Sequence, residues 1–335
     1  MMKFTDSCLP FKRMFSVLPE FNPEEGKTVV EPLSSGFGWW SGACSVIYDD
    51  ATKLFYLYYR LRKPRELGRG AICRVAVSDD GINFKTIWEA TREQFNSESI
   101  EKASLVKAPN DRWRLYISFV GEDGKWRIEM MEADSPDAFD PSRRVKVLSP
   151  EDVGVEGVKD PYVFFIGGCT FMLLSCAPRP EVITPELERQ MHATADVYAT
   201  GLTRSTTALA TSADGVNFEW HGIVFEPNPG KWDGYAARIS TLIYEPPVFI
   251  AFYDGSATVE ENYEEKTGLA LTFDLRNYIR VSVDAPLLKS PHSTGSLRYM
   301  DAVDMGSEIL LYYEYARPDG SHELRMSVLK RTRWQ

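Results

Sequence analysis

The sequence predicts an all-β protein, a five-bladed β-propeller with four-stranded blades, in a single domain over residues 1–335. Segments 78–84 (SDDGINF) and 212–218 (SADGVNF) share Ser, Asp-Gly, Asn and Phe at the same positions, with Ile in one and Val in the other, which indicates an internal repeat. Five hairpins of apolar strands rich in Tyr, Phe and Leu also follow one another along the chain. Because four-stranded units repeated around an axis form a propeller, these observations together favour that fold.

The two matching segments are predicted to be outer hairpin turns of equivalent blades. Segment 78–84 follows the alternating run 71–77 and leads into another, while segment 212–218 lies between similar runs. Asp-Gly between two such runs is the strongest short signal for a hairpin, because glycine tolerates the positive φ of the tight turn.

Each predicted blade begins with an inner hairpin, in which a polar or Gly/Pro turn joins two apolar strands. The inner hairpins span residues 41–61, 100–120, 158–177, 237–255 and 297–315. Third strands are predicted at 72–78, 126–133, 207–212, 268–273 and 323–329. Fourth strands are predicted for the first four blades at 84–90, 144–150, 218–225 and 278–283.

The fifth blade lacks a fourth strand of its own. Residues 11–20 resemble the fourth strand of the third blade, so this N-terminal strand is expected to close the last blade. Such closure is physically sensible because an open sheet edge invites mispairing. A β-sandwich with repeated hairpins is the competing interpretation.

One segment, residues 184–196, has the pattern of a helix, with Thr184 as the cap and Pro185 in the first position. It belongs to an insertion at about 178–204, between the second and third strands of the third blade. The insertion leaves the central face of the propeller and is expected to form a lid or an oligomer contact.

The composition is that of a globular protein with a substantial core, since 44% of the residues are hydrophobic and 26% are charged. A formal net charge of −10 argues against nucleic acid or an anionic membrane as partner. The N-terminal segment contains Asp6, Lys12 and Arg13, so no secretory signal is expected. Five cysteines without Cys-x-x-Cys spacing indicate reduced thiols and a cytoplasmic location.

Charged residues stand at the ends of the inner strands, which meet at the central mouth of a propeller. Counting back from matched points in the second strands places Asp160, Arg238 and Arg298 in equivalent positions, with Glu101 and Lys102 in the second blade. The second strands end at Arg60, Cys176, Asp254 and Glu314. Burying several charges around one opening is costly unless they pair or bind something polar, so the mouth is the predicted site. For each residue, the alternative is that it caps a turn or pairs with a neighbour.

Segment 157–164 (GVKDPYVF) resembles the x-Asp-Pro strand start of the five-bladed propeller glycosidases, the superfamily that holds glycoside hydrolase families 43, 32, 62 and 130. The two Asp-Gly hairpins resemble the Ser-x-Asp-Gly-x-x-Trp hairpins of the same superfamily. The resemblance covers nearly the whole chain and supports the fold more strongly than the activity.

The resemblance implies cleavage of a glycosidic bond of a small saccharide, by hydrolysis or by phosphorolysis. In such enzymes one carboxylate activates water and a second acid protonates the leaving oxygen. Their environments must hold one group protonated and the other ionised at the same pH. Asp160 matches the x-Asp-Pro position, which implies that it tunes the acid.

The chain departs from this pattern in the first blade, where Ser41-Gly42-Ala43 stands in place of the water-activating Asp. Lys159 and Tyr162 stand where the phosphorylases have Glu and Arg. A second hypothesis is therefore a non-catalytic propeller that binds a sugar or a protein partner and has lost the standard reaction.

The predicted catalytic carboxylates are Asp160, Glu101, Asp301 and Glu314. The predicted substrate-binding residues combine aromatic rings, which stack on sugars, with charged groups that bind hydroxyls or anions: Trp39, Trp40, Trp232, Asp233, Tyr235, Arg238, Asp254 and Arg298. The two arginines favour an anionic substrate or a phosphate co-substrate. No metal or cofactor is predicted, because the four histidines lack zinc-like spacing; some members of the family hold a calcium ion or water on the axis.

Overall fold

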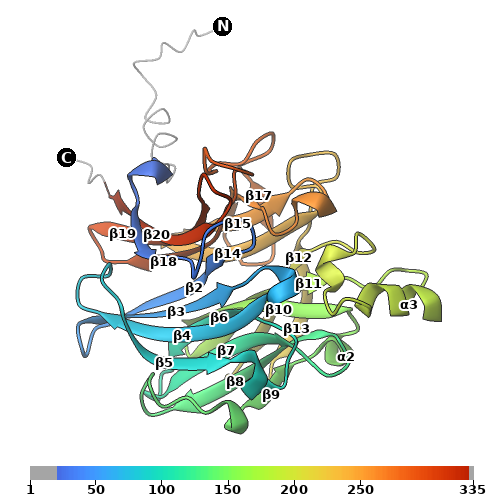
Figure 1. The fold of residues 1–335 in the computed structure, drawn as a ribbon. Coiled ribbons are helices and arrows are strands. Elements are labelled where there is room, and N and C mark those ends of the chain that lie inside the picture. The colour runs from blue at the N-terminus through green and yellow to red at the C-terminus, as the bar shows by residue number, and fades with distance from the viewer. Residues whose placement is uncertain (1–20, 332–335) are drawn as a thin grey trace, which may run out of the picture.

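The structure is a computed structural model and describes residues 21–331. Antiparallel four-stranded sheets, the blades, are arranged around one axis (Figure 1). Blades five and one also join through a single parallel bridge between Trp40 and His322. The predicted fold class, a five-bladed β-propeller, is confirmed.

In the first four blades the strands follow chain order from the axis outward, as the sequence pattern predicts. Blades one and two contain β2 (Trp40–Asp49), β3 (Leu54–Arg62), β4 (Gly70–Ser78), β5 (Lys85–Thr91), β6 (Ile100–Lys107), β7 (Trp113–Val120), β8 (Trp126–Ala133) and β9 (Val145–Leu148). Blades three to five contain β10 (Gly157–Ile166), β11 (Cys169–Ala177), β12 (Thr206–Ser212), β13 (Glu219–Phe225), β14 (Ala236–Glu245), β15 (Val248–Ser256), β16 (Lys266–Thr272), β17 (Tyr278–Arg280), β18 (Leu297–Asp304), β19 (Glu308–Ala316) and β20 (His322–Lys330).

The last blade is closed by β1 (Lys27–Val30), which pairs antiparallel with β20. An N-terminal strand therefore protects the edge of blade five, but it lies further along the chain than the predicted segment 11–20. That segment is outside the described residues.

Apolar side chains pack between each pair of neighbouring blades. Five clusters of buried residues lie at the five junctions, so the core forms a ring rather than a single centre. Tyrosine hydroxyls add polar contacts at these junctions: Tyr312 donates to the carbonyl of Gly81 at 2.7 Å, and Tyr116 donates to that of Gly215 at 2.8 Å. The repeated Asp-Gly turns thus fix one blade against the next.

In both repeated turns the aspartate accepts hydrogen bonds from the backbone and the side-chain amide of the asparagine three residues later. Blade four contains a third copy, Thr272–Asn277, with the same bonds to Asp274. The sequence pattern did not reveal it because Leu275, at φ 62°, stands where the other copies have glycine.

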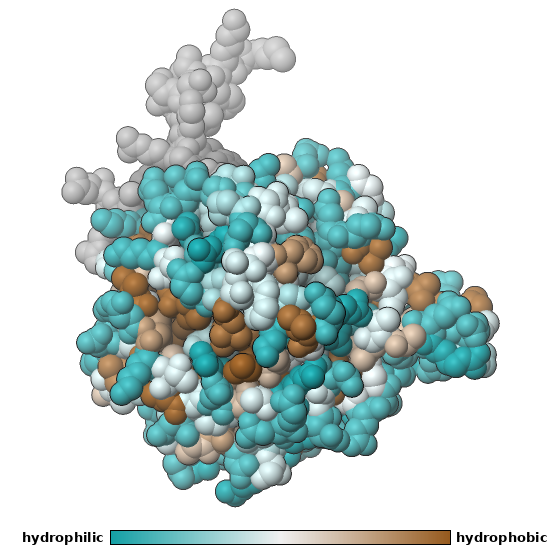
Figure 2. Space-filling view, in the orientation of Figure 1, coloured by the Kyte–Doolittle hydropathy of each residue, from teal (hydrophilic) through white to brown (hydrophobic). Residues whose placement is uncertain are grey.

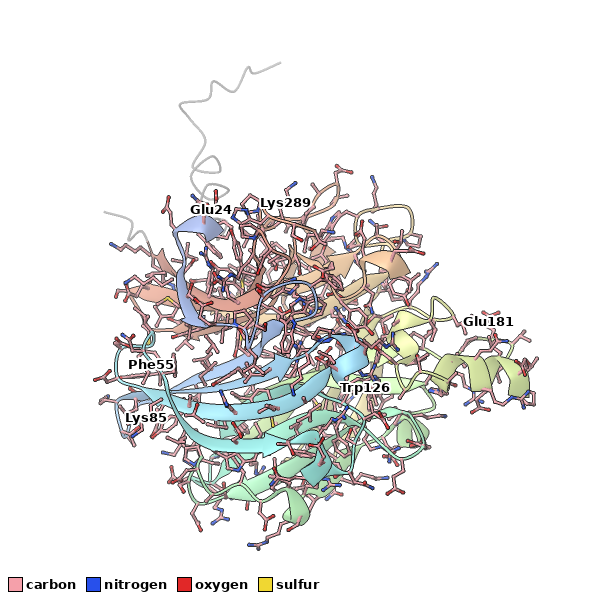
Figure 3. The ribbon with its side chains drawn as sticks, viewed as in Figure 1. Glu24, Phe55, Lys85, Trp126, Glu181 and Lys289 are labelled. Carbon is pink, nitrogen blue, oxygen red and sulfur yellow. The ribbon has the colours of Figure 1, made fainter. Side chains whose placement is uncertain are left out.

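The insertion between β11 and β12 contains α3 (Pro185–His192). Thr184 caps it by accepting from the backbone N–H of Leu187 at 3.2 Å, as predicted, but the helix ends at His192 and not at residue 196. α3 projects from the side of the propeller, and its surface is mainly hydrophilic (Figures 1 and 2). Figure 3 places Glu181 on this projection, whereas Trp126 is buried in the body.

A second short helix, α2 (Pro150–Val153), was not predicted. A capping box explains it: the side chains of Ser149 and Asp152 satisfy each other's backbone N–H groups. No helix in residues 21–331 is long and apolar enough to cross a membrane. Four cysteines within that range, Cys44, Cys73, Cys169 and Cys176, are free thiols.

Candidate functional site

The ladder between first and second strands shifts register near the head of every blade. Such bulges insert a residue and redirect the side chain at that point. Ala43, Asp160 and Tyr299 occupy the corresponding place in three blades, with φ values of 52°, 53° and 53°. A left-handed conformation at non-glycine residues is strained and clusters at functional sites.

The bulges also correct the predicted equivalence of the strand heads. Arg238 pairs with Asp254 and Arg298 pairs with Glu314, whereas the matching pair in blade three is Lys159 with Ser175. Lys159, and not Asp160, is therefore the counterpart of the two arginines, and Ser175 replaces Cys176. The two residues of each pair are equally far apart along the chain, so the error lay in matching the second strand of blade three one residue out.

The mouth cluster comprises the following residues, each at most 5% exposed: Arg60, Glu101, Lys159, Asp160, Arg238, Asp254, Glu265, Arg298, Tyr299 and Glu314. Most were predicted to meet here. Lys159, Glu265 and Tyr299 were missed. Glu265 lies just before a third strand, outside the inner hairpins that were searched.

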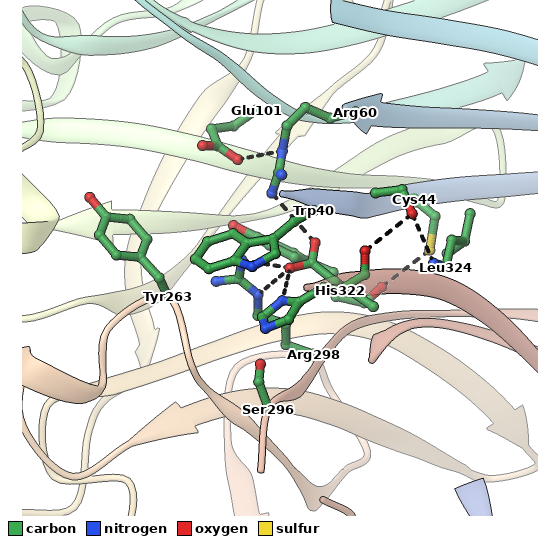
Figure 4. A network of polar contacts seen from close by, with 12 residues as sticks. Trp40, Cys44, Arg60, Glu101, Tyr263, Ser296, Arg298, His322 and Leu324 are labelled. Carbon is green, nitrogen blue, oxygen red and sulfur yellow. Dashed lines mark hydrogen bonds and ion pairs between the residues drawn. The ribbon is translucent and has the colours of Figure 1, made fainter. Parts of the chain in front are cut away.

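Glu314 is the most heavily bonded carboxylate of the mouth cluster, and Figure 4 labels its three partners, Arg60, Arg298 and His322. Arg298 donates to its Oε1 through Nε at 2.9 Å and Nη2 at 2.7 Å, and Arg60 donates to its Oε2 at 3.5 Å. His322 Nδ1 lies 2.8 Å from Oε1. Burial alone would raise the pKa of Glu314, but the charges of Arg298 and Arg60 hold this pKa well below its usual range.

Glu265 joins the two arginines that were predicted as anion clamps. Arg298 donates to it at 2.7 Å, and Arg238 forms a second ion pair with its other oxygen. Burial opposes ionisation, yet Arg238 and Arg298 lower the pKa of Glu265 to about 2. Both arginines are thus already matched by carboxylates of the protein.

Glu101 and Asp254 differ in their protonation. Burial would raise the pKa of Glu101, but Arg60, at 2.9 Å, lowers it below the usual value together with Arg62 and Lys159. Burial, and to a smaller extent the charge of Glu265, raise the pKa of Asp254 to about 7 against the lowering effect of Arg238. Around neutral pH, one carboxyl is ionised and a large fraction of the other is protonated.

Asp254 has few partners, which is consistent with its raised pKa. Its Oδ1 accepts from the backbone N–H of Tyr299 at 2.9 Å, and no ion pair among the described residues includes it. A carboxyl that is buried without a close cation favours its neutral form.

Asp160 lies in blade three, the neighbour of the blade that holds Asp254. Its Oδ2 accepts from the Ser175 hydroxyl at 3.2 Å and lies 3.7 Å from Lys159 Nζ, while its Oδ1 is buried without a hydrogen-bond partner. An oxygen left unbonded in the interior is costly unless something fills the place.

Tyr299 connects these groups. The Arg298 and Arg238 guanidiniums lie 4.9 and 5.9 Å from its ring centroid. Burial raises the pKa of Tyr299, and the nearby charges of Asp160 and Glu101 raise it further. The ring therefore lies among residues from four different blades.

Gly42 explains how blade one adapts to this arrangement. A Cβ at residue 42 would lie 2.1 Å from Glu314 Oε2, so the Glu314 carboxyl occupies the space of a side chain at this position. The position where the resemblance expects a catalytic aspartate is thus filled by a carboxylate from blade five.

We expect Gly42→Ala to destabilise the fold by about 1–3 kcal/mol, because the added methyl overpacks against a bonded carboxylate. The free energy of unfolding in urea measures this. Gly157→Ala is the matched control, since its Cβ would lie no closer than 3.1 Å to Val197 Cγ1. Equal costs in the two variants would contradict the steric account.

The predicted aromatic platforms lie mainly in packed positions. Trp40 is buried and stacks on His322 at 4.4 Å, and Trp232 stacks on Tyr253 at 5.5 Å within blade four. Tyr235 lines a pocket of about 520 Å³ beside the insertion. Trp39 is half-buried and next to the mouth.

Two predicted acidic residues are engaged elsewhere. Asp233 is buried and pairs with Arg280 at 2.6 Å, within blade four. Asp301 accepts from the backbone N–H of Val46 at 2.7 Å and from the Thr241 hydroxyl at 3.1 Å, so it ties blades one and four to blade five.

The surroundings of Asp301 show whether the axis offers a site for a calcium ion. Burial raises the pKa of Asp301, and the Lys102 ammonium opposes that shift, so a cation of the protein already faces it. Residues 21–331 contain no group of three or more His, Cys, Asp or Glu side chains able to hold a metal. These residues do not fit calcium.

The insertion reaches from blade three to residues of blades one and four. Its Asp196 pairs with Arg69 of blade one at 3.2 Å and accepts from the hydroxyl of Tyr263 in blade four. Glu156, just before β10, holds the insertion at two points: it pairs with Arg179 near its start at 3.2 Å and with His192 at the end of α3 at 2.8 Å. Of the two predicted roles, these contacts favour the lid.

No model of a protein family matches the chain, and no curated protein matches its sequence. Solved structures share its fold at low identity. A thermostable family-43 glycoside hydrolase is similar with a TM-score of 0.62 and 13% identity, over 90% of this chain and 91% of that one. A β-1,2-mannobiose phosphorylase from Listeria innocua, in complex with β-1,2-mannobiose, has a TM-score of 0.59 and 16% identity, over 93% and 95%.

An endo-arabinase from Bacteroides thetaiotaomicron is also similar, with a TM-score of 0.60 and 12% identity over 90% of this chain and 98% of that one. The chain thus has the fold of the five-bladed propeller glycosidases and phosphorylases across nearly its whole length, as the sequence resemblance predicted.

Proposed function

We propose that the protein cleaves the glycosidic bond of a small saccharide at the central mouth, with Asp254 as proton donor and Glu101 as the ionised carboxylate. The observation that supports this most directly is the opposite displacement of their pKa values. Two carboxyl groups that are held in different protonation states within one site are suited to acid and base roles.

The chemistry follows from those states. A protonated Asp254 gives its proton to the leaving oxygen, and Glu101 accepts a proton from the attacking water. Asp160, with its unbonded Oδ1, and Tyr299 lie between these blades and are proposed to orient the sugar.

Glu314 has a different proposed role. Its oxygens are occupied by Arg298, Arg60 and His322, so it holds Arg60 against Glu101 as a positioning residue. Asp301, with its hydrogen bonds to the inner strands, is likewise proposed to position the blades.

The test is incubation of the pure protein with aryl-glycosides and short oligosaccharides, with and without phosphate. Turnover that is lost in Glu101→Gln supports the proposal. Turnover only with phosphate would identify a phosphorylase, and turnover without it a hydrolase. Absence of turnover throughout the panel would overturn the proposal.

A second candidate function is a propeller that binds a sugar without cleaving it. The burial of the mouth cluster favours this alternative, because Asp254 is only 1% exposed and is therefore not open to a saccharide in this structure. A thermal shift with one sugar that remains uncleaved over days would support it.

A further inference from the structure

Arg62, at the end of β3, is a buried cation without an ion-pair partner among the described residues. Only 4% of the residue is exposed, and its Nε and Nη1 are buried without a hydrogen-bond acceptor. Within residues 21–331, no carboxylate oxygen lies within 4.0 Å of a side-chain nitrogen of Arg62. The three arginines of the mouth cluster, Arg60, Arg238 and Arg298, each have such a partner.

Aromatic rings hold this guanidinium in place. Its central carbon lies 4.4 Å from the ring centroid of Trp40 and 4.4 Å from that of Tyr263. A cation–π contact contributes about 0.5–2 kcal/mol, whereas an unpaired buried charge costs several kcal/mol. The two rings therefore orient the guanidinium without satisfying its charge or its donors.

Lys159 repeats this arrangement from blade three. It is 2% exposed, and its ammonium lies 4.7 Å from the ring of Tyr198 and 5.2 Å from that of Trp126. Its closest carboxylate oxygen, on Asp160, is 3.7 Å away, beyond ordinary hydrogen-bond length. Two cations of the mouth are thus supported mainly by aromatic faces.

Both cations act on the same carboxylates. Arg62 and Lys159 lower the pKa of Glu101 after Arg60, and they also lower that of Asp196 after Arg69. Their contacts meet at Asp196. Arg62 stacks on Tyr263, whose hydroxyl donates to Asp196, while Lys159 lies over Trp126, whose ring also faces Arg69, the ion-pair partner of Asp196. An anion at this place would gain from both cations.

We propose that Arg62 and Lys159 bind an anionic substituent, a carboxylate or a phosphate, on the saccharide that enters the mouth. This inference rests on the proposed function for its location and names the substrate class. It replaces the expectation based on Arg238 and Arg298, whose charges are matched by Glu265 and Glu314. Arginine's planar fork suits either anion.

The experiment compares the affinities of galacturonate, glucuronate and galactose 6-phosphate with those of galactose and glucose by calorimetry at low salt. Wild type should bind an acidic sugar at least tenfold tighter than its neutral parent. The uronate and phosphate arms identify which anion is preferred.

Arg62→Met keeps the stem against Trp40 and Tyr263 but removes the charge, and it should reduce the preference at least tenfold. Arg65→Met, an exposed arginine three residues away, should retain it. If Arg62→Met does not fold, the wild-type comparison and Lys159→Met still decide the matter.

Equal affinity for acidic and neutral sugars, or a preference that survives in Arg62→Met, would overturn the inference. Cleavage of neutral glycosides without any preference for acids would overturn it and leave the proposed function standing. A preference for acids without cleavage would support it and overturn the proposed function.

Discussion

Asp254→Asn should lower kcat for glycoside cleavage by about 10²–10⁴-fold, the contribution expected of a general acid. Asparagine keeps the shape of the protonated acid and can still accept from the backbone N–H of Tyr299, so the fold should be retained. It has no proton to give to the leaving oxygen. Steady-state kinetics with an activated and an unactivated leaving group measure the loss, which should be larger for the unactivated one.

Asp304→Asn is the matched control. Asp304 lies at the turn between β18 and β19, where it pairs with Arg331, so this variant should leave kcat unchanged. If kcat falls by less than about tenfold in Asp254→Asn, Asp254 is not the general acid.

Glu314→Gln should lower the free energy of unfolding by about 3–5 kcal/mol, the cost of breaking a buried ion pair from one side. The variant leaves Arg298, Arg60 and His322 facing a neutral amide in a site without solvent. Urea denaturation near pH 7 measures the difference.

The effect should depend on pH. A depressed carboxyl pKa stabilises the fold above the unfolded pKa, so the difference between wild type and Glu314→Gln should shrink as the pH falls below about 4.5. Glu308→Gln, at the outer end of the same strand, is the control. A cost below 1 kcal/mol for Glu314→Gln would contradict the assigned network.

The order of the strands could be predicted because alternating apolar runs and Asp-Gly turns are local signals. The bulges could not be predicted in this way. Asp160 was aligned with Arg238 and Arg298 because the second strand of blade three was matched one residue out: its continuous apolar run gives no marker of register, and a slip of one residue changes which side chain is placed at the mouth.

The site could be predicted in part for a similar reason. Residues at the ends of inner strands, such as Glu101, Asp254 and Glu314, were expected because the fold places all of those ends at one mouth. Glu265 and Arg62 gain their importance from contacts that cross blades or from the absence of a partner, and neither property is visible in a sequence.

The most direct test of the account is the pH dependence of kcat/KM for glycoside cleavage by the wild-type protein. With Asp254 as the acid, kcat/KM should be level from about pH 5 to 6.5 and should fall about tenfold per pH unit above about 7, as Asp254 loses its proton. The residual activity of Asp254→Asn should lack this decline. A profile that stays level through pH 8, or no cleavage at any pH, would contradict the proposed pairing of Asp254 with Glu101.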